Sequence, residues 1–215
     1  MSTPGDHLDR LIERLTRECL NGIVHYQFWR HINDLGRDEP ELIETAPAFF
    51  RSTFNAHIDC ATLRLNRLID TTRGAVSVYT LLRYAERHPQ AFRAGGPDEV
   101  KEAVARGRAI LGEVEDVLAR FRKQRNAYFV HIAGDYFSEP QREVTEEHPV
   151  TFRDVHDSLQ RIGRLISAIV GPHRDAELRL NEVIGIDESF QSLRHYLRAG
   201  VQFEEEYRQQ IHRAV

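Results

Sequence analysis

The chain has 215 residues, of which 41% are hydrophobic and 29% are charged, and its net charge is −4. This length allows one substantial core, or a core with a small appendage, and the composition is ordinary for a soluble globular protein. The negative charge argues against a protein that coats nucleic acid non-specifically, but it is compatible with an enzyme that contacts a few phosphates in a local basic cleft.

The sequence predicts neither a membrane anchor nor a secretory signal. No apolar run approaches the roughly 20 residues of a membrane span, and the first residues lack the basic start and apolar stretch of a signal peptide. Cys19 and Cys60 fall inside predicted helices, which suggests buried small hydrophobic residues in a reducing compartment. We therefore expect a cytoplasmic protein without disulfides.

Helical periodicity dominates the first half of the chain. We expect a first helix from Asp6 to about Leu35, ended by Gly36, followed by a loop over residues 36–40. A second helix is predicted from Pro47 to about Thr72. A short helix then follows over residues 77–87, before Pro89. The apolar stripes of the two long helices include Leu8, Leu11, Leu15, Cys19, Ile23 and Tyr26, and then Phe50, Phe54, Ala61, Leu65 and Leu68.

A long helix opening at residues 95–97 carries the most informative feature of the chain. Apolar or small residues recur along it at steps of three and four: Val100, Val104, Gly107, Leu111, Val114, Leu118 and Phe121. The next position in that rhythm is Arg125, where an apolar residue is expected. An arginine on a buried stripe costs several kcal/mol unless it is paired or faces a wet cleft. We therefore expect the chemistry of the protein near Arg125, unless it pairs with an acid such as Glu18 or Asp70 across the bundle.

The second half of the chain continues the helical pattern. Residues 135–150 are polar and predict a loop, and Thr151 with Asp154 predicts a capping box. The helix that follows has a stripe beginning at Phe152 and is expected to stop at Gly171-Pro172. Because no strand pattern is convincing, we predict an all-α antiparallel bundle over residues 1–172. Residues 173–215 are predicted to form one or two shorter helices, one from near Asp187, packed on the same domain.

Arg125 is followed at close spacing by His131, and the two residues together suit RNA cleavage. Imidazole is matched to proton transfer near neutral pH, and a guanidinium matches a phosphate in charge and geometry. On a straight helix, however, side chains six positions apart point about 120° apart and are separated by about 9 Å along the axis. Two copies related by a two-fold axis would gather both pairs around one cleft, so we expect a homodimer.

The stretch Arg125-Asn126-x4-His131 resembles the ribonuclease motif of the HEPN superfamily, which is Arg, a polar residue, a few residues and then His. The surrounding chain resembles the AbiU-type abortive-infection branch of that superfamily over roughly residues 15–170. The similar segments are residues 46–50 (APAFF), residues 63–70 (LRLNRLID) and the cluster Tyr26, Phe28 and Trp29.

The resemblance implies a dimeric, metal-independent endoribonuclease that acts as a toxin or in phage defence, with RNA as substrate and an antitoxin protein as a possible partner. Arg125, His131 and Asn126 would then form the catalytic group. No cofactor or metal is expected, since no histidine has a glutamate three residues before it and the cysteines lack zinc spacing. The alternative is a non-catalytic HEPN-like protein that binds a partner protein or a nucleotide.

Further residues near the motif are candidates for RNA contact. Arg122 and Lys123, with Arg120, would form a phosphate-facing patch, although a solvated helix face explains the same pattern. Tyr128 would stack on a base, although core packing is the simpler explanation for it.

Overall fold

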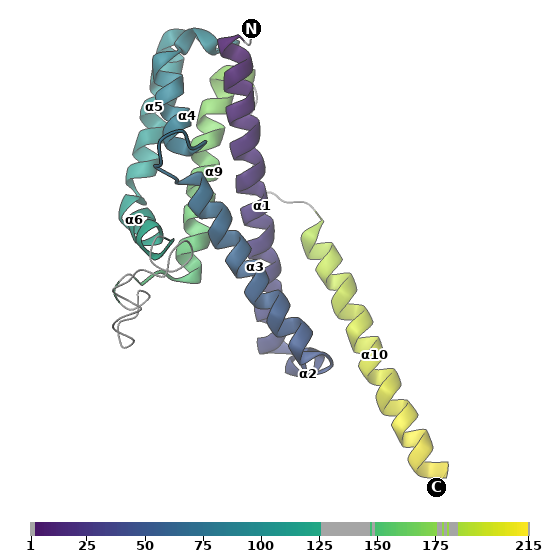
Figure 1. The fold of residues 1–215 in the computed structure, drawn as a ribbon. Coiled ribbons are helices and arrows are strands. Elements are labelled where there is room, and N and C mark those ends of the chain that lie inside the picture. The colour runs from purple at the N-terminus through teal and green to yellow at the C-terminus, as the bar shows by residue number, and fades with distance from the viewer. Residues whose placement is uncertain are drawn as a thin grey trace. The chain divides into compact units, whose positions relative to one another are not determined.

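A computed structural model describes residues 3–125, 147, 149–175, 178, 180 and 185–214. These residues are helical with no strand among them, which confirms the all-α prediction (Figure 1). In chain order the helices are α1 (Pro4–Asp38), α2 (Pro40–Glu44), α3 (Pro47–Leu68), α4 (Val78–Arg87), the 3-10 turn η1 (Pro89–Ala91), α5 (Pro97–Gly112), α6 (Glu115–Gln124), α9 (Phe152–Arg174) and α10 (Ile186–Ala214). None of the described helices is both long and apolar enough to cross a membrane.

The chain divides into two compact units, each assembled from two separate segments. The first unit contains Met1–Ile23 and Cys60–Glu182, and the second contains Val24–Asp59 and Val183–Val215. The long helices α1 and α3 each contribute residues to both units. The division predicted from the sequence, into a bundle over residues 1–172 and an extension over residues 173–215, follows sequence order alone and stays a prediction.

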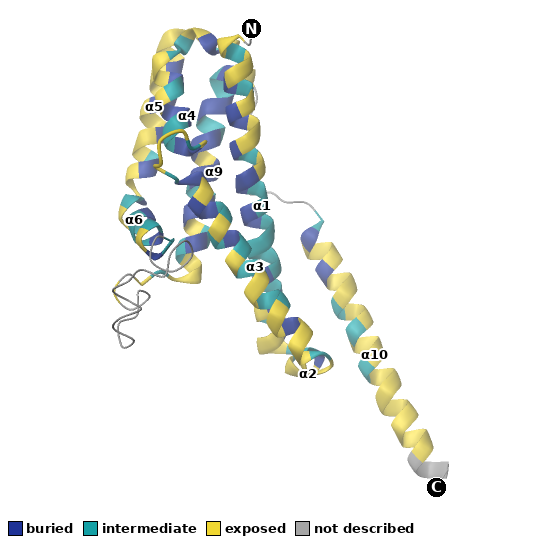
Figure 2. Cartoon of the chain, in the orientation of Figure 1, coloured by how far each residue is buried: buried dark blue, intermediate teal, exposed yellow. Residues whose placement is uncertain are grey.

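The first unit buries the apolar stripe that the sequence predicts around Arg125. Every stripe member from Val100 to Phe121 is buried, and Leu118 and Phe121 are wholly inaccessible (Figure 2). The predicted single helix is wrong, because a turn at residues 113–114 separates α5 from α6. Val114 has left the helical region, with φ −121° and ψ 2°, yet its side chain stays buried. The buried stripe therefore continues across the turn, and for that reason the spacing of apolar residues alone does not reveal the break between α5 and α6.

Close packing in this unit depends on glycines that face large side chains. A Cβ placed on Gly22 of α1 would lie 2.8 Å from Leu159, and one on Gly107 of α5 would lie 2.8 Å from Leu82 of α4. Cys19 is buried nearby, with its Sγ 3.5 Å from the carbonyl oxygen of Leu159. Burial raises the pKa of the Cys19 thiol to about 12. Its expected role as a small hydrophobic residue is confirmed, whereas Cys60 is only half-buried.

Helix α9 begins as predicted but does not end as predicted. Thr151 and Asp154 form the capping box, with the Asp154 amide donating to Thr151 Oγ1 over 3.1 Å and the Thr151 amide donating to Asp154 over 2.7 Å. The helix passes through Pro172 and ends at Arg174, and the next residue, Asp175, has the left-handed φ of 49°. The Pro172 carbonyl accepts the Gly95 amide over 2.6 Å, so this last turn is held from outside the helix. Phe152 is half-exposed, not part of the buried stripe.

The second unit has its own core around α2 and the first turns of α10. Its buried members are Ile32, Leu35, Leu42, Phe50 and Phe190. The predicted loop at residues 36–40 is wrong, because α1 continues through Gly36 to Asp38 and α2 begins at Pro40. In the described part of residues 175–215, the helix predicted to start near Asp187 is confirmed, because α10 begins at Ile186, but its 29 residues make it longer than expected. Helices α2 and α10 are stabilised by burying Leu42 and Phe190, and this contribution from packing cannot be read from the helix-start and helix-stop residues of the sequence.

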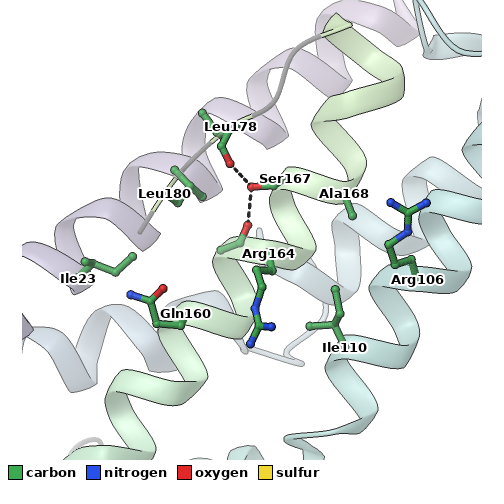
Figure 3. Close-up of a pocket in the computed structure, with 10 residues that line it drawn as sticks. Ile23, Arg106, Ile110, Gln160, Arg164, Ser167, Ala168, Leu178 and Leu180 are labelled. Atoms are coloured by element: carbon green, nitrogen blue, oxygen red, sulfur yellow. Dashed lines mark hydrogen bonds between the residues drawn. The ribbon is translucent and has the colours of Figure 1, made fainter. Parts of the chain in front are cut away.

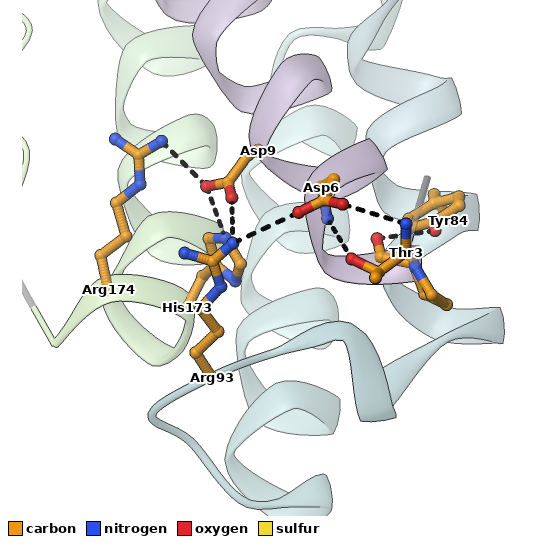
Figure 4. Close-up of polar contacts among 8 residues, drawn as sticks. Thr3, Asp6, Asp9, Tyr84, Arg93, His173 and Arg174 are labelled. Atoms are coloured by element: carbon orange, nitrogen blue, oxygen red, sulfur yellow. Dashed lines mark hydrogen bonds and ion pairs between the residues drawn. The ribbon is translucent and has the colours of Figure 1, made fainter. Parts of the chain in front are cut away.

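An ionic cluster fastens three segments of the first unit around Asp9 (Figure 4). Asp9 of α1 lies 3.0 Å from Nε2 of the buried His173, 3.1 Å from Arg174 at the end of α9, and 2.5 Å from Arg93. Burial by itself raises the pKa of the Asp9 carboxyl, but the hydrogen bonds from His173 and Arg174 and the charge of Arg93 lower it by more. The net pKa lies below its ordinary value, so ionised Asp9 stabilises the folded state.

We expect Asp9→Asn to lower the free energy of unfolding by about 2 kcal/mol at neutral pH, the scale of hydrogen bonds to a charged group. Because the pKa of Asp9 is depressed in the folded state, this contribution is present above the unfolded-state pKa and is lost as pH falls through the folded-state pKa. Thermal unfolding of wild type and variant should therefore differ at pH 7 and converge in acid. Glu102→Gln, on the exposed face of α5, is the control and should change little. A difference that is constant with pH would contradict the account.

Candidate functional site

Arg125 sits directly after α6, at the end of the buried stripe. Its side chain is 17% exposed, while Phe121 one turn earlier is fully buried. The placement agrees with the sequence prediction that this arginine takes a position normally occupied by an apolar side chain. A largely buried guanidinium needs a counter-charge or hydrogen-bond acceptors close by.

The counter-charge is Asp70, in the turn that follows α3. Arg125 Nη1 lies 3.3 Å from Asp70 Oδ2, and the Thr72 amide donates to Asp70 Oδ1 over 2.9 Å. Burial raises the pKa of the Asp70 carboxyl, but the Thr72 hydrogen bonds and the Arg125 charge outweigh it, so the net pKa is lowered. Asp70 is therefore a carboxylate held in place from two sides, and it fixes the direction of the Arg125 guanidinium.

Glu18, the other acid expected to be within reach of Arg125, belongs to a different cluster. Its side chain is almost fully buried, with an arginine from α3, Arg64, at 2.7 Å and a second from α1, Arg14, at 3.0 Å. Arg67 lies at 3.7 Å. Burial raises the pKa of Glu18, but these arginines, Arg64 foremost, lower it by more. This cluster joins α1 to α3 within the first unit.

Arg122, the predicted RNA contact one turn before Arg125, already bridges two helices. Its Nη1 donates to the Tyr79 hydroxyl over 2.7 Å and its Nη2 to Glu115 over 2.5 Å. Burial foremost raises the pKa of Tyr79 to about 12. The bridge thus connects α6 to α4 close to the turn that separates α5 from α6. Lys123, by contrast, is exposed on α6.

The other predicted site residues, Asn126, Tyr128 and His131, lie outside the residues that the structure describes. The structure therefore places Arg122, Lys123 and Arg125 on one short stretch and adds Asp70. Sequence reasoning considered Asp70 only as one of two acids, because periodicity along one helix does not identify contacts between helices. Over the described ranges, no group of three or more His, Cys, Asp or Glu side chains is arranged to hold a metal ion.

A cavity that the sequence did not predict lies between α5 and α9 (Figure 3). Its volume is about 670 Å³, and two arginines line it, Arg106 from α5 and Arg164 from α9. The apolar part of its wall includes Ile23 and Ile110, and the Ser167 hydroxyl beside it is within hydrogen-bonding reach of the carbonyls of Gly163 and Leu178. Arg125 does not line this cavity, so the two regions are separate features of the first unit.

Comparison with known proteins confirms the resemblance to the AbiU-type branch of the HEPN superfamily. The family that matches is AbiU2 of the HEPN proteins, and the match covers residues 5–189. No curated protein and no solved structure matches the chain. Since the matched region includes most of both compact units, with Arg125 and Asp70 inside it, the chain belongs to the AbiU2 family of HEPN proteins.

Proposed function

We propose that the protein is a metal-independent endoribonuclease in which Arg125 and His131 cleave RNA. The observation that carries the proposal is the position of Arg125, a largely buried arginine at the end of an apolar stripe in a HEPN-family chain. Keeping a guanidinium there costs free energy, which a use in phosphate chemistry explains. Asp70 offsets part of that cost and holds the guanidinium in one direction.

The proposed reaction needs only groups that the chain and the RNA supply. The ribose 2′-oxygen attacks the adjacent phosphorus and loses its proton, and the bond from phosphorus to the 5′-oxygen breaks. His131 moves the proton, as a base toward the 2′-hydroxyl or as an acid toward the leaving 5′-oxygen. Arg125 stabilises the negative charge that builds on the phosphoryl oxygens. The products are a 2′,3′-cyclic phosphate and a 5′-hydroxyl.

The neighbouring residues would support this chemistry. Asn126 would orient the catalytic pair, and Tyr128 would stack on a base. Lys123 is exposed on α6 and would meet a phosphate. Arg122 would do so only by giving up its contacts with Tyr79 and Glu115, so we assign it the weakest part in RNA binding. In the cell, such an enzyme would act as a toxin or an abortive-infection effector, restrained by an antitoxin protein.

A second candidate function is a non-catalytic HEPN module that binds a protein or a nucleotide. One observation favours it: Arg125 and Arg122 each contact a carboxylate of their own chain. In that case Arg125 is an internal ion-pair partner, and its replacement matters only through stability. The effects of Arg125→Ala and His131→Ala on RNA cleavage separate the two functions.

We expect Arg125→Ala and His131→Ala each to slow RNA cleavage at least about 100-fold, the usual scale for the loss of a proton-transfer or charge-stabilising group. Cleavage rates of the purified variants, and growth arrest on induced expression in a bacterial host, are the measurements. Circular dichroism should show near-native helical content in both variants.

Two control variants test whether lost stability explains lost cleavage. Asp70→Asn removes the charge that Arg125 faces but keeps the guanidinium and a side-chain oxygen that can accept a hydrogen bond from it, so it should slow cleavage by about tenfold, far less than Arg125→Ala. Arg164→Ala removes an exposed arginine from the α5–α9 cavity and should leave cleavage unchanged. Full activity in Arg125→Ala, or equal losses in Arg125→Ala and Asp70→Asn, would defeat the catalytic assignment.

Cleavage is expected to persist in excess EDTA, since the proposed nucleophile and proton-transfer groups need no metal. The products should carry 2′,3′-cyclic phosphate ends, detectable because these 3′ ends resist 3′-end labelling until the cyclic phosphate has been opened and the resulting phosphate removed. Substrates with a single 2′-deoxyribose at the cleavage position should not be cut there. Activity that EDTA abolishes and magnesium or manganese restores would refute this mechanism.

If two copies form the cleft, the activity of a wild-type chain should depend on which chain it pairs with. An excess of His131→Ala chains should poison wild-type cleavage once subunits exchange, because mixed dimers hold an incomplete set of groups. Sedimentation at assay concentration gives the matching physical measurement. A fully active monomer would rule out the shared cleft and require both residues to act within one chain.

A further inference from the structure

Helix α10 carries an apolar stripe that points away from its own unit. The stripe consists of Leu193, Tyr196, Gly200, Phe203 and Tyr207, at successive steps of three and four residues, and all five are exposed. Tyr196 is 72% exposed and Phe203 is 71% exposed. A heptad-like row of this kind is typical of a helix that packs lengthwise against another helix.

This stripe differs from the face that α10 uses inside its own unit. Phe190 is buried in the core of the second unit, with Leu197 and Val201 packed against that core. Arg194 and Arg198 both pair with Glu39 near the start of α2. At 100° per residue, the centre of this inner face lies about 100° around the helix from the centre of the exposed stripe. The helix therefore has two apolar faces, of which its own unit covers one.

Among the described side chains in the second half of α10, residues 202–211, none is buried. Each residue from 202 to 211 is exposed, and this stretch includes Phe203, Tyr207 and Ile211. A helix of about three turns gains too little from hydrogen bonds alone to be stable in water, and helices in proteins are stabilised chiefly by burying an apolar face. The stretch thus needs a partner along the exposed stripe.

The charges along α10 indicate what that partner is. Residues 189–203 carry Arg194, His195 and Arg198 and no acid, whereas residues 204–206 are three consecutive glutamates. Glu39 and Arg208 each neutralise only part of these two blocks. A second α10 running antiparallel would set each acidic block beside a basic block. A parallel copy would set six glutamate carboxylates at the same level, which is unfavourable.

We infer that α10 is a self-association element, which pairs antiparallel with α10 of a second copy of this chain along Leu193, Tyr196, Gly200, Phe203 and Tyr207. In the matching register Phe203 lies over Gly200 of the other copy, where the missing side chain leaves room for an aromatic ring, and Tyr196 lies beside Tyr207. This interface involves the α10-containing unit and not Arg125, so it is independent of the proposed RNA cleavage. It gives the protein a second way to assemble.

Disulfide trapping tests both the pairing and its direction. Chains with Tyr196→Cys and chains with Tyr207→Cys, distinguishable by size and both carrying Cys60→Ser, are mixed under reducing conditions and then oxidised. We expect mixed disulfides to exceed self-disulfides, because antiparallel pairing brings position 196 to position 207. Two copies of position 207 would then be about 16 Å apart, too far for a disulfide. The control pair, Gln202→Cys and Gln209→Cys, lies on the far side of α10 and about 12 Å out of the proposed register, so it should not crosslink.

The stripe residues should also control the strength of the association. Adding Phe203→Ser to both chains should lower the yield of the mixed disulfide and weaken association in sedimentation at least about tenfold, as expected for a central interface aromatic. Phe203 is largely exposed in its own chain and belongs to no buried core, so the variant should keep its helical content and RNA cleavage. Predominant self-disulfides would show parallel pairing, and the absence of any crosslink would show that a different molecule covers the stripe. Either result overturns the proposal.

Discussion

The ion pair between Arg125 and Asp70 is the interaction on which the account of this protein depends. It joins the end of α6 to the turn after α3, at the point where an otherwise apolar stripe ends in a charge. The Thr72 amide donates a hydrogen bond to Asp70, so the carboxylate is oriented independently of its contact with the guanidinium. The arginine consequently has one preferred direction, which is what a group that stabilises a developing charge requires.

Other ionic contacts of the first unit have a different character. The Asp9 cluster ties α1 to the end of α9, and the Glu18 cluster ties α1 to α3, with each carboxylate meeting several cations. In both clusters the cations outweigh the cost of burial and lower the pKa of the acid. These contacts stabilise the scaffold that positions Arg125. The α10 stripe is a separate matter, because its exposed aromatic residues have no role in that scaffold.

Much of this architecture follows from the sequence, because burial imposes a period that can be counted. The stripe from Val100 to Phe121 is buried as predicted, and the capping box at Thr151 forms as predicted. The turn at residues 113–114 escaped prediction because Val114 stays in phase with the stripe across it. The helix through Pro172 escaped because the contact that supports its last turn comes from Gly95, far away in the chain.

The candidate site was predictable on one helix and not between helices. Arg125 stood out because its charge breaks an apolar rhythm, a signal contained in one segment. Its partner Asp70, the bridge from Arg122 to Tyr79, and the two-unit organisation all depend on contacts between distant segments. Periodicity carries no information about such contacts. The sequence therefore left both Glu18 and Asp70 as candidate partners for Arg125, and the structure shows that Asp70 is the one it contacts.

The most direct test of the central claim is the single-turnover RNA cleavage rate of the double variant Arg125→Ala/Asp70→Asn, compared with both single variants. If Arg125 acts on the phosphate, Asp70 matters only through it, so removing the unpaired charge cannot restore the rate. The account predicts that the double variant stays as slow as Arg125→Ala. If Arg125 serves only to neutralise Asp70, the double variant should regain cleavage close to that of the wild type, and this result would contradict the account.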